Sequence, residues 1–79
     1  MAKLELYGSA GCPYTEEMRE WLEWNHREFV EYDVEADIEA RIRLRSIDHD
    51  LRAVPVLVED GKVVQVGWHG RSCVVVPRA

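Results

Sequence analysis

The chain has 79 residues, of which 47% are hydrophobic and 32% are charged, with a formal net charge of −5 at pH 7. This length predicts a single domain over residues 1–79, and the apolar content excludes a disordered chain. The charge argues against a nucleic-acid surface, which needs a basic stripe. No run approaches the roughly 20 apolar residues of a membrane span, and the N-terminus lacks a signal peptide's apolar core. We therefore expect a cytoplasmic monomer that binds neither nucleic acid nor membrane.

The N-terminal third predicts a strand, a loop and a helix. Residues 3–7, KLELY, alternate in polarity and are followed by the loop residues 8–11. Pro13 suits the first turn of a helix, where its missing N–H costs nothing, and the acidic residues behind it suit the helix dipole. The helix is expected over residues 13–26, with Trp24 exposed. One face of it is shared by Met18, Trp21, Leu22 and Asn25.

The middle of the chain predicts a second strand and a second helix. Residues 28–34, EFVEYDV, alternate, and Asp37 can cap a helix that follows it. Two apolar stripes run along this helix. Ile38 and Ile42 form the narrower stripe, which is either exposed or covers a partner. The wider stripe is expected in the core and contains Ala40, Leu44, Ile47 and Leu51.

The last third predicts a hairpin and a tail. Residues 54–59, VPVLVE, form a continuous apolar run that predicts a buried central strand. The Asp60–Gly61 pair that follows is a strong hairpin signal, with the returning strand over 62–67. Residues 68–79 are rich in β-branched residues and make a poor helix, so they form an edge strand or an extended cover. The order β-α-β-α-β-β predicts a mixed four-stranded sheet with helices on its faces.

Cys12 stands where the first loop meets the first helix. The free N–H groups and partial positive charge of a helix start stabilise a thiolate and lower a thiol pKa from its usual value of about 8.5. The Thr15 hydroxyl, in the first turn, can reach back toward the sulfur. Glu16 and Glu17 act against this, because nearby negative charge raises a thiol pKa. The alternative is a structural cysteine, since free cysteines are often buried.

The Val54–Pro55 pair precedes the predicted central strand. Proline is tolerated there only at the first residue or at a bulge. A cis bond would turn the Val54 backbone outward, so that it could pair with an extended thiol peptide beside Cys12. The alternative is an ordinary trans proline that starts a strand, and the sequence does not choose between the two.

Taken together, these motifs resemble the glutaredoxin branch of the thioredoxin fold over residues 3–67. GCPYT (11–15) is similar to the family's Cys-Pro-Tyr-Cys site, with Thr15 in place of the second cysteine. AVP (53–55) is similar to the Thr-Val-Pro segment with its cis-proline, and EDGKVVQVG (59–67) to the hairpin before the family's Gly-Gly turn. GWHGRSC (67–73) is similar to the end of a subgroup of small glutaredoxin-like proteins, some of which carry selenocysteine where Cys12 stands.

The resemblance implies a thioredoxin fold with a shortened or missing C-terminal helix. It implies a glutaredoxin-type thiol–disulfide oxidoreductase with Cys12 as nucleophile and no tightly bound cofactor. Glutathione is the implied co-substrate, and a protein thiol or disulfide is the other implied partner. Ser9 stands where the family usually has a lysine, and no acidic pair follows the turn. The implied substrate-binding residues are Tyr14, Val54, Pro55, Gly67 and Trp68.

A Cys-x-x-Thr site cannot close a local disulfide, so the second sulfur must come from elsewhere. A small thiol could complete a monothiol cycle, or Cys73 could act as a distant resolving cysteine if the two α-carbons come within about 7 Å. Cys73 could also be a small apolar residue without a redox role. No cysteine or histidine spacing predicts a metal site. The competing class is a non-catalytic thioredoxin-fold binding module that docks a partner on Ile38, Ile42 and Trp24.

Overall fold

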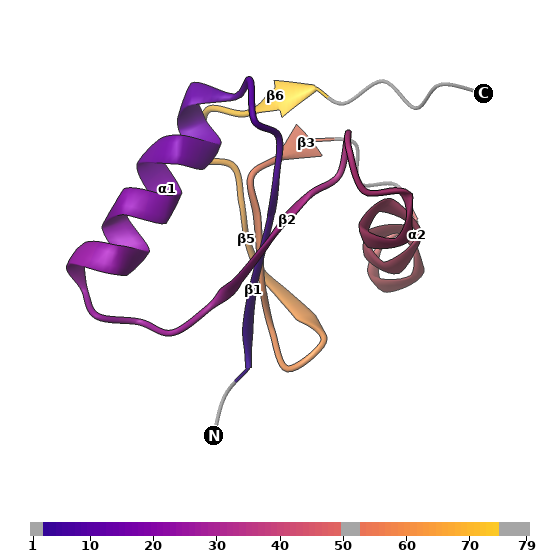
Figure 1. Ribbon diagram of the computed structural model, residues 1–79, viewed down its shortest axis with the longest axis horizontal. Helices are drawn as coiled ribbons and strands as arrows, with labels where there is room; N and C mark the ends of the chain where they lie inside the picture. The colour runs from indigo at the N-terminus through magenta and orange to yellow at the C-terminus, as the bar shows by residue number, and fades with distance from the viewer. Residues whose placement is uncertain (1–2, 50–52, 75–79) are drawn as a thin grey trace.

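A four-stranded sheet with one helix on each face forms the body of the protein (Figure 1). In this computed structural model we describe residues 3–49 and 53–74. The sheet order is β2-β1-β4-β5, and β3 and β6 pair in a separate sheet of two strands. The elements along the chain are β1 (Leu4–Gly8), α1 (Pro13–Trp24), β2 (Val30–Asp33), α2 (Ile38–Ile47), β3 (Ala53–Val54), β4 (Val56–Glu59), β5 (Lys62–Val66) and β6 (Cys73–Val74).

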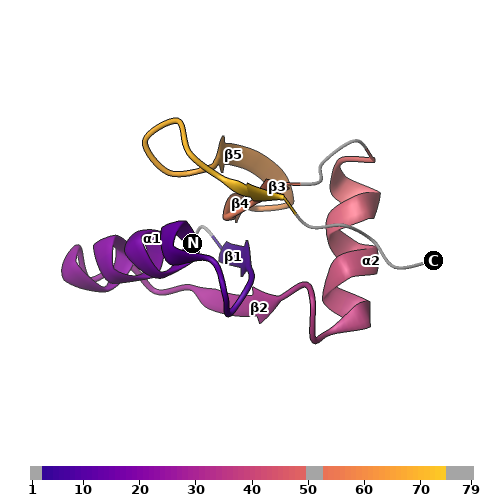
Figure 2. The same ribbon diagram turned by 90° about the horizontal axis from the view of Figure 1, so that it is seen from above.

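The helices α1 and α2 lie on opposite sides of the sheet, which makes three layers (Figure 2). Side chains alternate across a strand, and this period sorts the core into two clusters. The cluster on the α1 side consists of Leu4, Leu6, Met18, Leu22 and Leu57. The cluster on the α2 side consists of Tyr7, Cys12, Val34, Ala40, Leu44, Val54, Val56 and Val58. Ala40 and Leu44 thus lie in the core as predicted, whereas Leu51 falls outside the described residues.

Strand pairing follows the predicted framework. β1 pairs with β2 in parallel and with β4 antiparallel, and β4 pairs antiparallel with β5. The hairpin turns at Asp60 and Gly61, whose φ angles are 51° and 81°. Asp37 caps α2, because its carboxylate accepts hydrogen bonds from the N–H groups of Glu39 and Ala40 at 3.0 and 3.2 Å. The mixed four-stranded sheet with two flanking helices is therefore confirmed.

The structure corrects one predicted strand and decides between two alternatives at Val54–Pro55. The strand predicted over 54–59 is divided at Pro55 into β3 and β4, since proline has no N–H to donate to a ladder. Val54–Pro55 is a cis bond, the first of the two alternatives. Of the four residues that share one face of α1, Met18 and Leu22 are buried, whereas Trp21 and Asn25 are exposed. The Trp21 ring lies 5.8 Å from that of Trp68.

Other exposures agree with the sequence. Trp24 is 84% exposed, as expected. Ile38 and Ile42 are also exposed, which is one of the two alternatives that the sequence left open. Of the tail, Cys73–Val74 forms an edge strand, and residues 75–79 lie outside the described part. Among the helices described, none is long and apolar enough to cross a membrane.

A buried tyrosine and a surface arginine connect α2 to the sheet. The Tyr7 and Tyr32 rings stack at 5.1 Å, and the Arg43 guanidinium lies 4.9 Å from the centre of the Tyr32 ring. The Tyr7 hydroxyl donates to the Glu5 carboxylate at 3.4 Å. Burial, and then the negative charge of Glu5, raise the pKa of the Tyr7 phenol.

Gly8, at the end of β1, lies directly against Thr15 of α1. A Cβ at Gly8 would overlap the Thr15 methyl and lie 2.7 Å from the Thr15 hydroxyl oxygen. We expect Gly8→Ala to lower the free energy of unfolding by about 1–3 kcal/mol, the usual cost of overpacking a core. Urea denaturation measures this change. Gly11→Ala is the matched control, since a Cβ there meets nothing within 4 Å, and an equal loss in both variants would contradict the prediction.

Candidate functional site

The candidate site lies where β1 and β2 end and α1 begins (Figure 1). Parallel strands end at the same edge of a sheet, so Ser9, after β1, and Glu35, after β2, come together. The Val34 N–H donates to the Gly8 carbonyl at 2.9 Å and continues the pairing past the strands. The same edge carries the short strands β3 and β6.

Cys12 is the residue that caps the start of α1. Its backbone is extended, with φ −95° and ψ 114°, and Pro13 is the first helical residue. The Cys12 N–H donates to the Ser9 carbonyl at 3.1 Å, and the Cys12 carbonyl accepts from the Glu16 N–H at 3.3 Å. Cys12 therefore lies at a helix N-terminus as predicted. It is nevertheless only 3% exposed.

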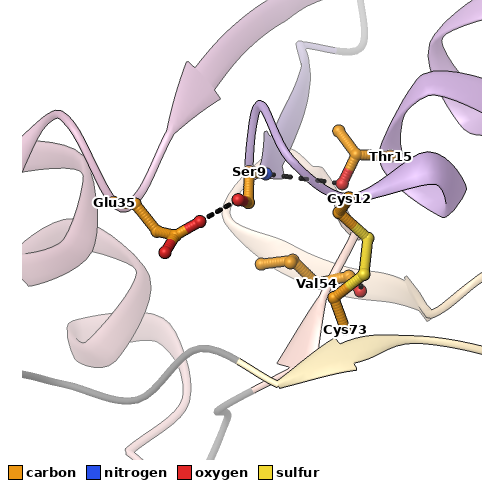
Figure 3. Close-up of a disulfide and its surroundings, with 6 residues drawn as sticks. All are labelled: Ser9, Cys12, Thr15, Glu35, Val54 and Cys73. Atoms are coloured by element: carbon orange, nitrogen blue, oxygen red, sulfur yellow. Dashed lines mark hydrogen bonds between the residues drawn. A yellow bond between two sulfur atoms is a disulfide. The ribbon is translucent and has the colours of Figure 1, made fainter.

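A disulfide joins Cys12 to Cys73 (Figure 3). The two residues are 61 positions apart in sequence, and their α-carbons are 6.0 Å apart. Each sulfur is thus the partner of the other, and the described residues include no free cysteine. The Cys12 sulfur also lies 3.9 Å from the carbonyl oxygen of Val54.

The strand β6 occupies the edge of β3. Val54 lies opposite Cys73, and Ala53 lies opposite Val74, in an antiparallel pair. The backbone of Val54, which we expected to face a thiol peptide, thus faces a cysteine peptide that belongs to the same chain. Pro55 is fully buried behind it.

Thr15 and Tyr14 support this arrangement from α1. The Thr15 hydroxyl accepts a hydrogen bond from the Ser9 N–H at 3.4 Å, and the residue is buried. Its hydroxyl therefore holds the loop before Cys12, whereas the sequence also allowed it to reach back toward the sulfur. Tyr14 is half-buried and packs against the cluster that contains Cys12 and Val54.

Gly67 and Trp68 lie differently with respect to the site. The Gly67 N–H donates to the Pro55 carbonyl at 2.7 Å, so this glycine supports the cis-proline segment. Its φ is 79°, which favours glycine. A Cβ at this position would also lie only 2.7 Å from the Arg71 carbonyl oxygen, so glycine alone fits. Trp68 packs against the cluster on the α1 side, whereas Cys12 belongs to the other cluster. The structure therefore does not bring the Trp68 side chain into the cluster of Cys12.

A cavity of about 220 Å³ opens beside the disulfide, lined by Ser9, Gly11, Cys12, Glu35, Cys73 and Val74. The Ser9 hydroxyl donates to the Glu35 carboxylate (Figure 3). The nearby Arg41 guanidinium donates to the backbone carbonyls of Val34 and Glu35 at 3.0 and 3.4 Å. Arg41 is not among the residues that line the cavity, so the described lining carries one carboxylate, that of Glu35, and no cationic side chain. The parallel pairing of β1 and β2 was the signal that could have identified Glu35 from the sequence.

The described residues include no group of three or more histidine, cysteine, aspartate or glutamate side chains placed to hold a metal ion. The chemistry that the arrangement supports is that of sulfur. A cysteine at a helix start, a second cysteine bonded to it and a cis-proline segment beside both define the thioredoxin-like class of proteins.

Solved structures agree with this class. The crystal structure of the thioredoxin-like protein BC3987 is similar at a TM-score of 0.69 and 38% identity, covering 77% of this chain and 82% of that one. A point mutant of the same protein gives a TM-score of 0.72 over 84% and 83% of the two chains. Glutaredoxin 1 from Francisella tularensis, complexed with cacodylate, shares the fold at a TM-score of 0.62 and 23% identity, covering 86% and 85%.

Residues 4–64 match the family model described as Glutaredoxin, so the chain belongs to the glutaredoxin family. A relative from Clostridium pasteurianum, an uncharacterized glutaredoxin-like 8.6 kDa protein in the rubredoxin operon, is 29% identical over 66 residues. That match covers 84% of this chain and 85% of the relative. The family gives the chain a thiol–disulfide oxidoreductase-like role, and the selenoprotein subgroup stays a prediction.

We expect the disulfide to stabilise the fold measurably. A link across 61 residues removes chain entropy from the unfolded state, which the loop-closure relation puts at about 4 kcal/mol. Urea denaturation with and without dithiothreitol should show a loss of this order in the wild type. Cys73→Ser is the control, because it should have the lower stability in both conditions. Equal wild-type stability with and without reductant would contradict the prediction.

We expect the Glu35 charge to slow anionic thiols at the cavity. At about 10 Å in water, two unit charges interact by about 0.4 kcal/mol, so Glu35→Gln should speed reduction of the disulfide by glutathione about twofold at low salt. Reduction by cysteamine is the control and should not change, because its ammonium group makes the reacting thiolate form neutral overall. Stopped-flow measurement of both rates tests this. An effect that persists at 1 M salt would show that it is not electrostatic.

Proposed function

We propose that this protein is a thiol–disulfide oxidoreductase that cycles between a Cys12–Cys73 dithiol and the Cys12–Cys73 disulfide. The observation that carries the proposal is the disulfide itself. It joins the helix-start cysteine to a cysteine 61 positions away, beside a cis-proline segment. In this pair Cys73 provides the second sulfur, because Thr15 occupies the position of the family's second cysteine.

The cycle starts from the dithiol. The Cys12 thiolate, stabilised by the N-terminus of α1, attacks a substrate disulfide, and one substrate sulfur leaves as a thiolate that takes a proton. The Cys73 thiolate then attacks the Cys12 sulfur, forms the Cys12–Cys73 disulfide and releases the second substrate thiol. Two electrons pass from the two cysteines to the substrate. Two external thiols, or one dithiol, return them to the protein and are themselves oxidised to a disulfide.

Two further residues assist by position. Val54 presents its backbone to the cysteine segment that reacts with Cys12, as it does to Cys73. Thr15 holds the loop through Ser9 and so fixes where Cys12 stands. We propose glutathione or a protein dithiol as the electron donor, and the cytoplasm as the compartment, because its thiol pools keep such a pair reduced between turnovers.

A binding module without catalysis is the second candidate. The observation in its favour is the apolar stripe of Ile38 and Ile42 on α2, which are 65% and 62% exposed. In that case the disulfide would act only as a staple for a small core.

Reduction of insulin disulfides, with dithiothreitol as electron donor, separates the two candidates. Cys12→Ser should fall to the uncatalysed rate, because it removes the attacking thiolate. Cys73→Ser should still form a mixed disulfide on Cys12, which mass spectrometry detects, but should release its product slowly. Ser72→Ala is the matched control beside Cys73 and should keep the wild-type rate. Wild-type turnover in Cys12→Ser would sink the enzyme proposal and leave the staple.

A further inference from the structure

The two sulfurs of the disulfide are not equally accessible. Cys12 is 3% exposed and belongs to the core cluster on the α2 side. Cys73 is half-buried, and Val74 next to it is 74% exposed. A thiol that arrives from solvent therefore meets Cys73 more readily than Cys12.

The strand that carries Cys73 is also the one that covers Cys12. β6 lies along β3 in a sheet of only two strands, so within the described chain its other edge has no strand beside it. The cavity beside the disulfide reaches both cysteines, but Cys12 is enclosed by its own cluster as well. Access thus favours the sulfur on the open strand.

The two sulfurs also differ as leaving groups. The rate of disulfide exchange rises when the departing thiolate is stable. Cys12 departs at the N-terminus of α1, where free N–H groups and the helix dipole stabilise negative charge. Cys73 departs from a strand that offers no such site. Two groups act against a thiolate at Cys12: the Val54 carbonyl oxygen, 3.9 Å from the sulfur, and the Glu35 carboxylate, which lines the same cavity. Of the two cysteines, however, it is Cys12 that has a helix N-terminus beside it to stabilise the thiolate.

We propose that external thiols reduce the oxidised protein by attacking Cys73, and that Cys12 is the leaving group. This rests on the proposed function and gives its two cysteines separate tasks. The incoming thiolate bonds to the Cys73 sulfur, the Cys12–Cys73 bond breaks, and Cys12 leaves as a thiolate. A second thiol then attacks the sulfur of the bound donor and releases Cys73 as a thiolate, which takes a proton. Electrons therefore enter at Cys73 and leave to substrate at Cys12.

The position of the first adduct tests the proposal. The oxidised full-length protein is mixed with excess 2-mercaptoethanol, quenched in acid at successive times, treated with N-ethylmaleimide and mapped by peptide mass spectrometry. Extrapolated to zero time, the mercaptoethanol adduct should lie on Cys73 with at least about tenfold excess over Cys12, from access and leaving-group stability together. 2-Mercaptoethanol is small and carries no charged group besides its reacting thiolate.

The same reaction in concentrated urea is the matched control. Unfolding removes both the burial of Cys12 and the helix start, so the adduct should divide about equally between the two cysteines. An equal division, or an excess on Cys12, in the folded protein would overturn the proposal. If Cys12→Ser still abolishes insulin reduction in that case, the proposed function survives and only this assignment of tasks fails.

Discussion

The bond between Cys12 and Cys73 determines where the last described strand lies. Among the residues that the structure describes, β6 has two residues and pairs with β3 alone. A backbone hydrogen bond contributes about 1 kcal/mol net, so such short pairing holds a strand weakly when it acts alone. The covalent link keeps β6 on Val54, buries Cys12 and closes one wall of the cavity. The accessible chemistry of the oxidised protein therefore follows from this one connection.

The position of Cys12 itself depends on the loop that precedes it. Thr15 packs on Gly8 and accepts from the Ser9 N–H, and the Ser9 carbonyl accepts from the Cys12 N–H. A threonine where a second active-site cysteine would stand is thus part of the structural support of the loop. Because that support comes from within the first turn of α1, it ties the position of Cys12 to the helix start. The sulfur bonded to Cys12 comes from another part of the chain, at Cys73.

Local signals in the sequence were sufficient for most of the framework. Asp37 caps α2 through its own side chain, and Asp60–Gly61 turns the hairpin through two residues with positive φ. Both depend on neighbours in sequence, so both were predictable. β6 depends on pairing with β3 and on a bond across 61 positions, which no local pattern encodes. Glu35 reaches the site because β1 and β2 are parallel. Trp21 lies beside Trp68, which belongs to the segment that sequence periodicity could not place.

The disulfide and the docking of β6 are coupled, and such coupling is reciprocal. Whatever free energy the disulfide contributes to holding β6 on β3, the pairing of β6 with β3 contributes to the disulfide. A partner that takes the Val54 edge must displace β6, and it thereby favours the dithiol, in which Cys12 is free to react. Conversely, a side chain that improves the packing of β6 stabilises the oxidised form and makes the protein harder to reduce. A cysteine on a separate strand thus connects the redox state to occupancy of the Val54 edge, whereas two cysteines in one helical turn would leave that edge open in both states.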